Sequence, residues 1–307
     1  MHLEGPAGET VRGALVGAHE RGVAVRLAYN VDHPGHGKGP PPPQTDPGLI
    51  ESLPVPTRGI PGVPDLMHHK YVVRDRQALW TGSTNWTGDS WTREENVIVR
   101  VVSPGIAAAY TQDFEQLWQT SSVEKSGRVA PDPVAVGDTT VRPWFCPKRS
   151  GRLVHRIADA LGRAQRRIRI ASPVLTSGPI LGTLAELVGN GRVDVAGVVD
   201  ATQIHEVLGQ WAQHPGGSWK TPLLVHVLSG APFTGKRSTP YGPGTVHDYM
   251  HAKLTVCDDT VFVGSFNLSH SGEANAENVL ELADAALADR LAAYVDTVRA
   301  RYPAVAL

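Results

Sequence analysis

The chain has little cysteine, almost no net charge and no long apolar segment, and each shortage excludes a class of protein. Two cysteines among 307 residues exclude a disulfide-rich scaffold and a zinc site made of four cysteines. Lys and Arg number 29 against 30 Asp and Glu, so the molecule has no net charge that would steer it to nucleic acid or an anionic bilayer. No run reaches the ~20 apolar residues of a membrane span, which predicts a soluble protein.

The chain does contain enough apolar sequence for a core, together with many turn-forming residues. Hydrophobic residues make up 41% of it, and 32 glycines and 24 prolines predict long surface loops. The N-terminus, Met1-His-Leu-Glu-Gly-Pro, lacks the basic start and apolar core of a secretory signal. The length fits one large α/β domain or two units of roughly 150 residues.

A long internal repeat divides the chain into two halves. Residues 67–100 and residues 250–280 each contain H-x-K-x4-D, then G-S-x-N, then E-N. The corresponding pairs are His68 and His251, Lys70 and Lys253, Asp75 and Asp258, Ser83 and Ser265, Asn85 and Asn267, Glu95 and Glu277, and Asn96 and Asn278. The first three pairs are 183 positions apart and the others 182, so we place a one-residue deletion in a turn between two strands.

The sequence around the motifs predicts a duplicated α/β fold. Helix-like stretches at 10–20 and 181–188 precede apolar strands at 23–29 and 193–199, and amphipathic helices at 107–118 and 285–302 follow the motifs. This alternation predicts two similar units, each a mixed, mainly parallel sheet with flanking helices, around a pseudo-two-fold axis. We assign residues 1–120 to the first unit, 121–140 to a linker and 141–307 to the second unit.

The two units differ at their beginnings. The second opens with a strand at 141–146, a helix at 152–164 and a strand at 167–171, and nothing before residue 9 corresponds to these. The first unit is therefore expected to lack its opening strand and helix. Either Met1 is an internal start, or the first unit has a genuinely reduced sheet. Because an internal start would also remove a signal peptide, the sequence leaves both a secreted and a cytoplasmic location open.

The repeated side chains suit a tetrahedral anion. Residues two apart in a strand project from one face, so His68 and Lys70 point together, as do His251 and Lys253. Lysine supplies a positive charge and three donors, while a hydroxyl and an amide at the same spacing supply neutral donors. The sequence predicts a phosphate site to which four further residues contribute, namely Ser83, Asn85, Ser265 and Asn267.

Two histidines on opposite sides of one phosphate could divide the chemistry of phosphodiester cleavage. A neutral imidazole can attack phosphorus to form a phosphohistidine, and a charged one can protonate the leaving oxygen and later activate water. We expect Glu95 and Glu277 each to accept a hydrogen bond from the non-reacting ring nitrogen of their own histidine. Asp75 and Asp258 complete the candidate catalytic set, although their place at strand ends favours a role in a turn. His69 is expected to pack or to support another residue.

No cofactor and no metal are expected at this site. A lysine beside each motif histidine would repel a cation. His33 and His36 have a spacing that could seat an ion, but they lie in a Gly- and Pro-rich stretch without a rigid carboxylate or thiol partner. Cys257 lies in an apolar run typical of a buried strand.

The duplicated H-x-K-x4-D motif resembles the signature of the phospholipase D superfamily. The resemblance extends from about residue 9 to 302, and the motif is highly specific. It implies that a phosphodiester bond is cleaved or exchanged in two steps without metal, with His68 as the nucleophile and His251 as the general acid. The residues that would then hold the phosphate are Lys70, Lys253, Asn85 and Asn267.

The resemblance predicts the reaction better than the substrate, because the superfamily includes phospholipases, phosphatidyl transferases, cardiolipin synthases and nucleases. Residues 142–169 hold nine Lys or Arg and one acidic residue, which suits nucleic acid or anionic headgroups, unless it is an ordinary solvated helix face. Loops at 31–66 and 213–247 should border the site, and an apolar rim there suits acyl chains.

The sequence therefore favours a phospholipase D-type phosphodiesterase that hydrolyses, or transfers, phospholipid headgroups. A metal-independent nuclease is the alternative enzyme, and an inactive phosphate-binding module is the alternative from another class. Phospholipid is the expected partner, with peripheral membrane contact, and nucleic acid is the second choice. The chain is expected to be a monomer.

Overall fold

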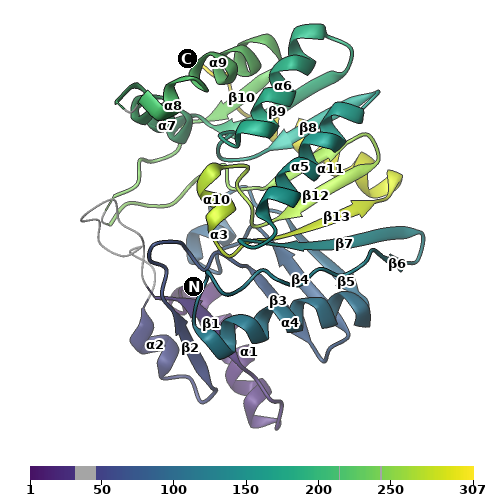
Figure 1. The fold of residues 1–307 in the computed structure, drawn as a ribbon. Helices are drawn as coiled ribbons and strands as arrows, with labels where there is room; N and C mark the ends of the chain where they lie inside the picture. Colours follow the sequence, from purple (N-terminus) through teal and green to yellow (C-terminus); the bar gives the residue numbers. More distant parts are fainter. Residues whose placement is uncertain (32–45, 214, 243) are drawn as a thin grey trace.

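The chain folds into a mixed α/β structure with one large sheet and two small ones, which confirms the fold class. The computed structural model describes residues 1–31, 46–213, 215–242 and 244–307. The large sheet has eight strands, and the small sheets have three and two. In Figure 1 the second half of the chain lies mostly in the upper part of the molecule and the first half in the lower part.

The second half contributes the eight-stranded sheet. Its strands are β6 (Val134–Val136), β7 (Thr139–Phe145), β8 (Arg167–Ala171), β9 (Asp194–Asp200), β10 (Phe233–Lys236), β11 (Leu254–Cys257), β12 (Thr260–Gly264) and β13 (Asn278–Ala283). Its helices are α5 (Ser150–Arg163), α6 (Gly178–Asn190), α7 (Ala201–Gln213), α8 (Pro215–Ser218), α9 (Thr221–Gly230), α10 (His270–Ala274) and α11 (Ala285–Arg299). The strand order is β10-β9-β8-β11-β12-β13-β7-β6.

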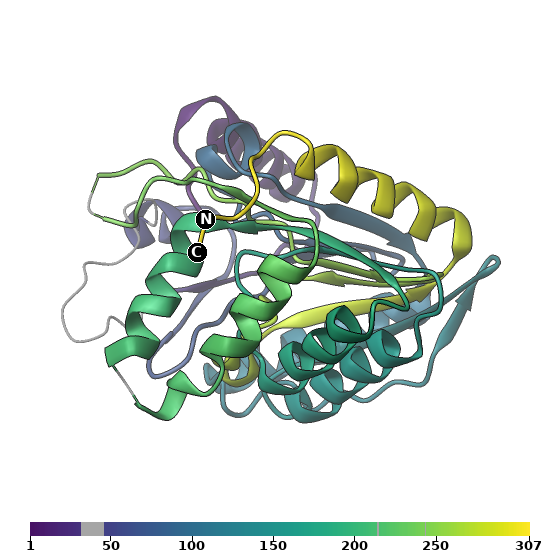
Figure 2. The same cartoon turned by 90° about the horizontal axis from the view of Figure 1, so that it is seen from above.

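Helices cover both faces of this sheet, as Figure 2 shows. On one face α5 buries Leu153, Ile157 and Leu161 in a core that includes Phe262 of β12. The four-residue spacing of these apolar positions gives α5 one buried stripe, so its arginines remain on the other side. On the opposite face α11 packs through residues such as Val295.

The first half contains similar elements in a similar order. They are α1 (Gly5–Glu20), β1 (Leu27–Asn30), α2 (Pro47–Glu51), β2 (Thr57–Ile60), β3 (Tyr71–Arg74), β4 (Ala78–Gly82), α3 (Gly88–Thr92), β5 (Ile98–Val102) and α4 (Pro104–Thr120). β1 and β2 form one parallel pair, and β3, β4 and β5 form a separate antiparallel sheet.

The two halves differ where the sequence predicts that the first unit lacks a strand and a helix. In the second half β8 lies between β9 and β11 and joins them into one sheet. In the described part of the first half, no strand joins the β1–β2 pair to the sheet of β3, β4 and β5. The outer face of the small sheet also differs, because Val72, Ile98 and Val102 are exposed there, whereas Val279 on the matching face of the large sheet is buried beside α5.

The expectation of mainly parallel sheets is wrong. Among the described residues three strand pairs are parallel and seven are antiparallel. The turns at 75–77 and 258–259 join β3 to β4 and β11 to β12, and such short connections form hairpins, because a parallel crossover needs a dozen or more residues. The one-residue difference between the repeats lies in this turn, as predicted.

A shared core joins the two halves. Leu79 of β4 and Tyr110 of α4 belong to the same buried cluster as Phe145 of β7, Val256 of β11 and Leu280 of β13. Tyr110 and Phe145 make an edge-to-face contact with ring centroids 4.9 Å apart. The motif-bearing strands β3 and β11 are therefore fixed relative to each other by close packing.

The segment predicted as a linker is partly strand. β6 and the first residues of β7 lie within 121–140, and β6 forms an edge of the large sheet. The domain boundaries stay a prediction. Of the predicted loop at 31–66, residues 32–45 lie outside the described residues, and these include Pro40, Pro43, His33 and His36. In the described part of the chain, no helix combines the length and apolar character needed to cross a bilayer.

The turn aspartates have different surroundings in the two halves. The carboxylate of Asp258 accepts hydrogen bonds from the backbone N–H groups of Gln165, Arg166 and Arg167, with N···O distances of 2.8, 2.9 and 3.0 Å. Burial raises the pKa of Asp258, but these hydrogen bonds outweigh it and lower the pKa overall. Asp75 has a side chain that is 66% exposed.

We predict that Asp258→Ala lowers the free energy of unfolding at neutral pH by about 2 kcal/mol, because it leaves backbone donors without their charged acceptor. Asp75→Ala is the matched control and should change it by less than about 0.5 kcal/mol. Because the folded-state pKa of Asp258 is lowered, its contribution is present above the unfolded pKa and is lost as pH falls through the folded pKa. Urea denaturation at neutral and acidic pH measures both effects, and equal losses in the two variants would contradict the prediction.

Candidate active site

Each repeated motif lies just before a strand. His68 and Lys70 precede β3, and His251 and Lys253 precede β11. In both motifs the lysine Nζ donates a 2.7 Å hydrogen bond to the backbone carbonyl of the histidine two residues earlier. Both lysines are buried. The two halves therefore present the same local arrangement of imidazole and ammonium.

Backbone pairing between the halves brings the two motifs together. The N–H of His68 donates to the carbonyl of Ala276 at 2.9 Å, in the segment before β13. The N–H of His251 donates to the carbonyl of Glu95 at 3.1 Å, in the segment before β5. Each histidine is thus anchored by the half of the chain that does not carry it.

The four motif side chains share one electrostatic environment. Burial lowers the pKa of His68 to about 4, against the raising effect of Glu277, and Lys70 and Lys253 lower it further. Burial also lowers the pKa of His251 well below its usual range, with Lys253, Lys70 and His68 acting in the same direction. Because charges from both halves act on each imidazole, the two motifs face one region, and that region suits an anion.

Burial lowers the pKa of both lysines as well. For Lys70 it falls to about 8, although Glu277 opposes the shift, and for Lys253 it falls because of burial and the neighbouring Lys70. Two ammonium groups so close together destabilise each other's charge. A bound phosphate would relieve this repulsion and raise the pKa of all four groups.

Glu277 holds the histidine of the opposite repeat. Its Oε1 lies 2.8 Å from Nδ1 of His68, and the carboxylate is completely buried. Ser265 Oγ and Asn275 Nδ2 also donate to this carboxylate. Because a carboxylate only accepts, Nδ1 of His68 carries the proton and Nε2 is left for a substrate. The predicted carboxylate partner is present, but it serves His68 and not His251.

His251 has a neutral partner in the corresponding place. Its Nδ1 lies 3.1 Å from the side-chain oxygen of Asn96, with a Glu94 carboxylate oxygen at 3.4 Å. Asn96 Nδ2 donates to the carbonyl of Ser90 and to Glu94, which directs its Oδ1 at the ring. His251 therefore also presents Nε2 to the site, but against an amide where His68 has a carboxylate.

The prediction that Glu95 supports a motif histidine is wrong. Its carboxylate accepts a hydrogen bond from Lys236 Nζ at 2.7 Å and another from the hydroxyl of Tyr302. Backbone pairing explains the error, because Ser83 N donates to the carbonyl of Val97, whereas Ser265 N donates to that of Asn278. In this register Asn96 occupies the position in the first half that Glu277 occupies in the second. The E-N match in the sequence is therefore offset by one residue from the structural match.

The serines do not match their predicted role as phosphate donors. The hydroxyl of Ser83 donates to Asn96 Oδ1 at 2.7 Å, and that of Ser265 donates to Glu277. Each serine Oγ also accepts a 3.0 Å hydrogen bond from a backbone N–H of the next strand. Their protons are used to orient the partners of the two histidines.

The asparagines of the G-S-x-N motifs remain candidates for holding a phosphate. Asn85 and Asn267 are partly exposed, and the side-chain oxygen of Asn267 is buried with no hydrogen-bond partner in the described structure. Asp75 and Asp258, in contrast, lie at the far ends of β3 and β11 from the histidines and are not brought into the site.

Three supporting residues were not predicted from the sequence. Asn30, at the end of β1, accepts a 2.9 Å hydrogen bond from the N–H of Met67, and Asp200, at the end of β9, accepts one of 3.0 Å from the N–H of Met250. Each bond holds the residue just before a motif histidine. In the sequence, both residues are recognisable as a polar residue at the end of an apolar strand.

Asn278 is the third, and it connects the halves. Its Nδ2 donates to the hydroxyl groups of Thr81 and Tyr110, and its Oδ1 lies 3.2 Å from Nδ1 of His69. Nε2 of His69 lies 3.0 Å from a carboxylate oxygen of the buried Asp113. His69 is therefore a packed, supporting residue, as its place in the sequence indicated.

The comparisons with known proteins agree with this arrangement. A family model described as "Cardiolipin synthase, PLD-like domain" matches residues 6–118 and 157–299. The chain belongs to this phospholipase D-like family. The structure of phosphatidylserine synthase from Haemophilus influenzae Rd KW20 shares the fold, with a TM-score of 0.68 and 13% identity over 97% of this chain and 78% of that chain.

Curated relatives of this phospholipase D-like chain match it over shorter stretches. The mitochondrial cardiolipin hydrolase of Xenopus tropicalis is 46% identical over 57 residues, or 17% of this chain and 25% of that protein. The mitochondrial cardiolipin hydrolase of Homo sapiens is 28% identical over 102 residues, or 33% and 37%. The chain matches about a quarter to a half of the length of the curated relatives.

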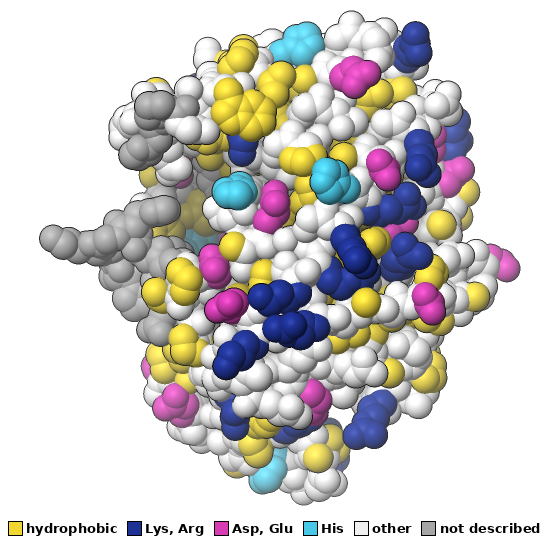
Figure 3. Space-filling view, in the orientation of Figure 1, with side chains coloured by type: hydrophobic (Ala, Val, Ile, Leu, Met, Phe, Trp, Pro, Cys, Tyr) yellow, Lys and Arg dark blue, Asp and Glu magenta, His cyan; other side chains and the backbone are white. Residues whose placement is uncertain are grey.

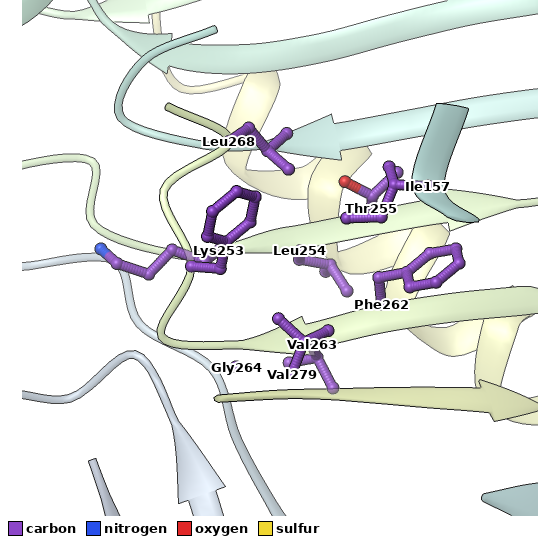
Figure 4. Close-up of a pocket in the computed structure, with 10 residues that line it drawn as sticks. Ile157, Lys253, Leu254, Thr255, Phe262, Val263, Gly264, Leu268 and Val279 are labelled. Atoms are coloured by element: carbon purple, nitrogen blue, oxygen red, sulfur yellow. The ribbon is translucent and has the colours of Figure 1, made fainter. Parts of the chain in front are cut away.

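The phospholipase D-like site is distinct from the small apolar pocket beside it. Figure 4 shows that pocket between β11, β12 and α5, lined by residues such as Ile157, Phe262 and Leu268. The Lys253 side chain extends away from it, with its amine beyond the strand. Within the described ranges, no group of three or more His, Cys, Asp or Glu side chains is placed to hold a metal ion.

We predict that Asn96→Asp raises the pKa of His251 by one to three units, because it places a carboxylate where the neutral amide lies. NMR titration of the histidine ring signals measures the shift. Glu95→Gln is the matched control and should leave the pKa of His251 unchanged, since Glu95 contacts Lys236 and Tyr302. An unchanged pKa in Asn96→Asp would contradict the described contact.

Proposed function

We propose that this protein hydrolyses phospholipid headgroup phosphodiesters by a two-step, phospholipase D-type reaction. The observation that carries the proposal is the meeting of two His–Lys pairs, one from each half, with both Nδ1 atoms held by partners. The side chains of His68 and His251 keep 17% and 10% of their surface exposed, so a substrate can reach them.

In the first step Nε2 of His68 attacks phosphorus. The bond from phosphorus to the headgroup oxygen breaks, and His251, protonated once the bound phosphate has raised its pKa, gives its Nε2 proton to that oxygen. The headgroup alcohol leaves, and a phosphatidyl group remains on His68. The lowered pKa of His68 keeps its ring neutral, and hence nucleophilic, at neutral pH.

In the second step His251, now neutral, accepts a proton from water as the water oxygen attacks phosphorus. The bond between phosphorus and His68 breaks, which frees the imidazole and releases phosphatidic acid. An alcohol in place of water would give transfer instead of hydrolysis. Lys70, Lys253, Asn85 and Asn267 are proposed to hold the phosphate oxygens.

The different partners of the two histidines support this division of roles. Attack on phosphorus leaves a positive charge on the ring of His68, and the buried Glu277 carboxylate stabilises that charge. His251 must give up its proton, and a neutral amide at Nδ1 retains that proton less strongly than a carboxylate would. The arrangement therefore favours His68 as nucleophile and His251 as acid.

Phospholipid is favoured as the substrate by the family and by the surface near the second motif. The matching family model and the curated relatives carry the names of cardiolipin synthases and cardiolipin hydrolases. The segment predicted as a loop at 213–247 contains α8, α9 and β10, and in its connecting parts Trp219, Tyr241 and Val246 are exposed, at 55%, 44% and 39%. Exposed apolar side chains suit an acyl or interfacial substrate better than a polyanion.

The roles of the two histidines can be separated with a substrate whose leaving group needs no proton. We predict that His68→Ala loses at least 1000-fold in turnover of every phosphodiester, whereas His251→Ala still releases a burst of nitrophenol from a nitrophenyl phosphodiester, with a phosphohistidine detectable by mass spectrometry. Wild-type turnover of phosphatidylcholine by His251→Ala would contradict the two-histidine scheme.

The substrate class can be tested by parallel assays on phosphatidylcholine vesicles and single-stranded DNA. We expect choline release without DNA cleavage, and no loss of activity with a chelator. DNA cleavage without choline release would instead support the nuclease alternative. Binding of phosphate with both substrates left intact would indicate an inactive module. His68→Ala is the negative control in every assay.

A further inference from the structure

The basic residues of the 142–169 segment divide into two groups in the structure. Four of them are neutralised by carboxylates, in the pairs Arg156–Glu281, Arg166–Asp259, Arg167–Asp289 and Arg169–Asp194. The other five, Arg142, Lys148, Arg149, Arg152 and Arg163, make no ion pair with any of the described residues. Of these five, Arg142 and Arg152 lie close enough to Arg149 for their charges to act on it.

Arg142 and Arg149 lie over the ring of Trp144 and Arg152 lies near Arg149, and we name these three arginines the Trp144 cluster. The guanidinium carbons of Arg142 and Arg149 lie 5.6 and 4.8 Å from the centre of the Trp144 ring. Glu281, which pairs with Arg142 in the sheet register, is already occupied, because its carboxylate accepts hydrogen bonds from Trp144 Nε1 and from Arg156. Arg149 is further fixed by a 3.1 Å hydrogen bond to the carbonyl of Val129.

The cluster is unfavourable for the folded chain by itself. Burial lowers the pKa of Arg149, and the like charges of Arg152 and Arg142 lower it further. Arg149 and Arg152 also lie at the beginning of α5, where the helix dipole disfavours positive charge. An anion bound at the cluster would relieve both effects.

The strand that carries Trp144 ends at the segment that holds His68. β7 ends at Phe145, which pairs with Asn278 at the start of β13, and the N–H of Cys146 donates to the carbonyl of Glu277 at 2.9 Å. Glu277 is the residue that holds His68. In Figure 3, Lys and Arg side chains gather across the middle of the face that carries α5 and β7. A surface bound at these arginines would therefore be close to the catalytic pair.

The chemistry of the cluster suits a surface of phosphate groups better than a single-stranded nucleic acid. Trp144 is only 5% exposed and is already stacked by guanidinium groups, so it has no open ring face for a base. Guanidinium groups bind phosphate oxygens with two parallel hydrogen bonds, and a compact set of them matches neighbouring headgroups at an anionic bilayer.

We propose that the Trp144 cluster is a binding surface for anionic phospholipid headgroups, which holds the active site at an anionic membrane surface. This inference rests on the proposed function, since it names the part of the protein that would bind the membrane containing the substrate. It is nevertheless tested by binding and not by turnover.

The experiment compares the wild type with Arg142→Gln/Arg152→Gln, which leaves Arg149 and its contacts intact. Arg12→Gln/Arg21→Gln, at exposed positions in α1 and just after it, is the control with the same change in net charge. Each protein is sedimented with vesicles of phosphatidylcholine and with vesicles of phosphatidylcholine mixed with phosphatidylglycerol. Competition with duplex DNA is measured in parallel.

We expect the wild type to prefer the anionic vesicles, the cluster variant to bind them about 30-fold more weakly, and the control to lose at most about threefold. Added salt should reduce the difference. No preference for anionic vesicles, an equal loss in both variants, or DNA binding that alone depends on Arg142 and Arg152 would overturn the proposal.

The two proposals fail in different ways. Vesicle binding that depends on the cluster, without turnover of any lipid, would contradict the proposed function and support the proposed binding surface. Suppose instead that the wild type and the cluster variant turn over a dispersed short-chain phospholipid equally and that neither binds vesicles. This result would contradict the proposed binding surface and support the proposed function.

Discussion

The structure depends on one buried contact between the halves, the hydrogen bond from Nδ1 of His68 to the carboxylate of Glu277. A carboxylate with no exposed surface is costly unless it is paired, and here an imidazole, a serine hydroxyl and an amide all donate to it. These donors come from both halves, so the carboxylate is satisfied only when the halves are packed together. The same contact sets the tautomer of His68. Packing between the halves and the readiness of the site for chemistry therefore have a common cause.

The two halves anchor their motif histidines by the same backbone hydrogen bonds, but the groups that contact the histidine rings differ in charge. Each histidine is anchored by a backbone carbonyl of the opposite half, and each motif lysine donates to the carbonyl of its own histidine. The ring partners differ, because Asn96 faces His251 where Glu277 faces His68. The carboxylate of Glu277 lies 2.8 Å from Nδ1 of His68, whereas that of Glu94 lies 3.4 Å from Nδ1 of His251, and this difference makes the imidazoles unequal. This inequality supports the two different roles that are proposed for the histidines.

The two halves also differ away from the active site. Asp258 accepts three backbone hydrogen bonds near the start of β8, whereas Asp75 is exposed at the matching turn. The segment that includes β7, α5 and β8 also carries the arginines around Trp144. The part of the second half without a counterpart in the first therefore contributes both to the large sheet and to the charged surface near the site.

The sequence by itself determined the residue types of the motifs, the α/β class, the position of the turn deletion and the place where the first half has fewer elements. These follow from local patterns, in which strand alternation, helical spacing and the repeated H-x-K-x4-D define what each segment can form and present. Only the tertiary structure decided which acceptor faces which histidine. His68 and Glu277 are 209 positions apart, and a one-residue offset in strand register moves Asn96, and not Glu95, beside His251. It likewise decided that the serines orient these partners, that most neighbouring strands among the described residues are antiparallel and which arginines of the 142–169 segment pair with a carboxylate. Each of these outcomes depends on the pairing of distant strands, and a pattern within one segment carries no information about the residue that packs against it from another.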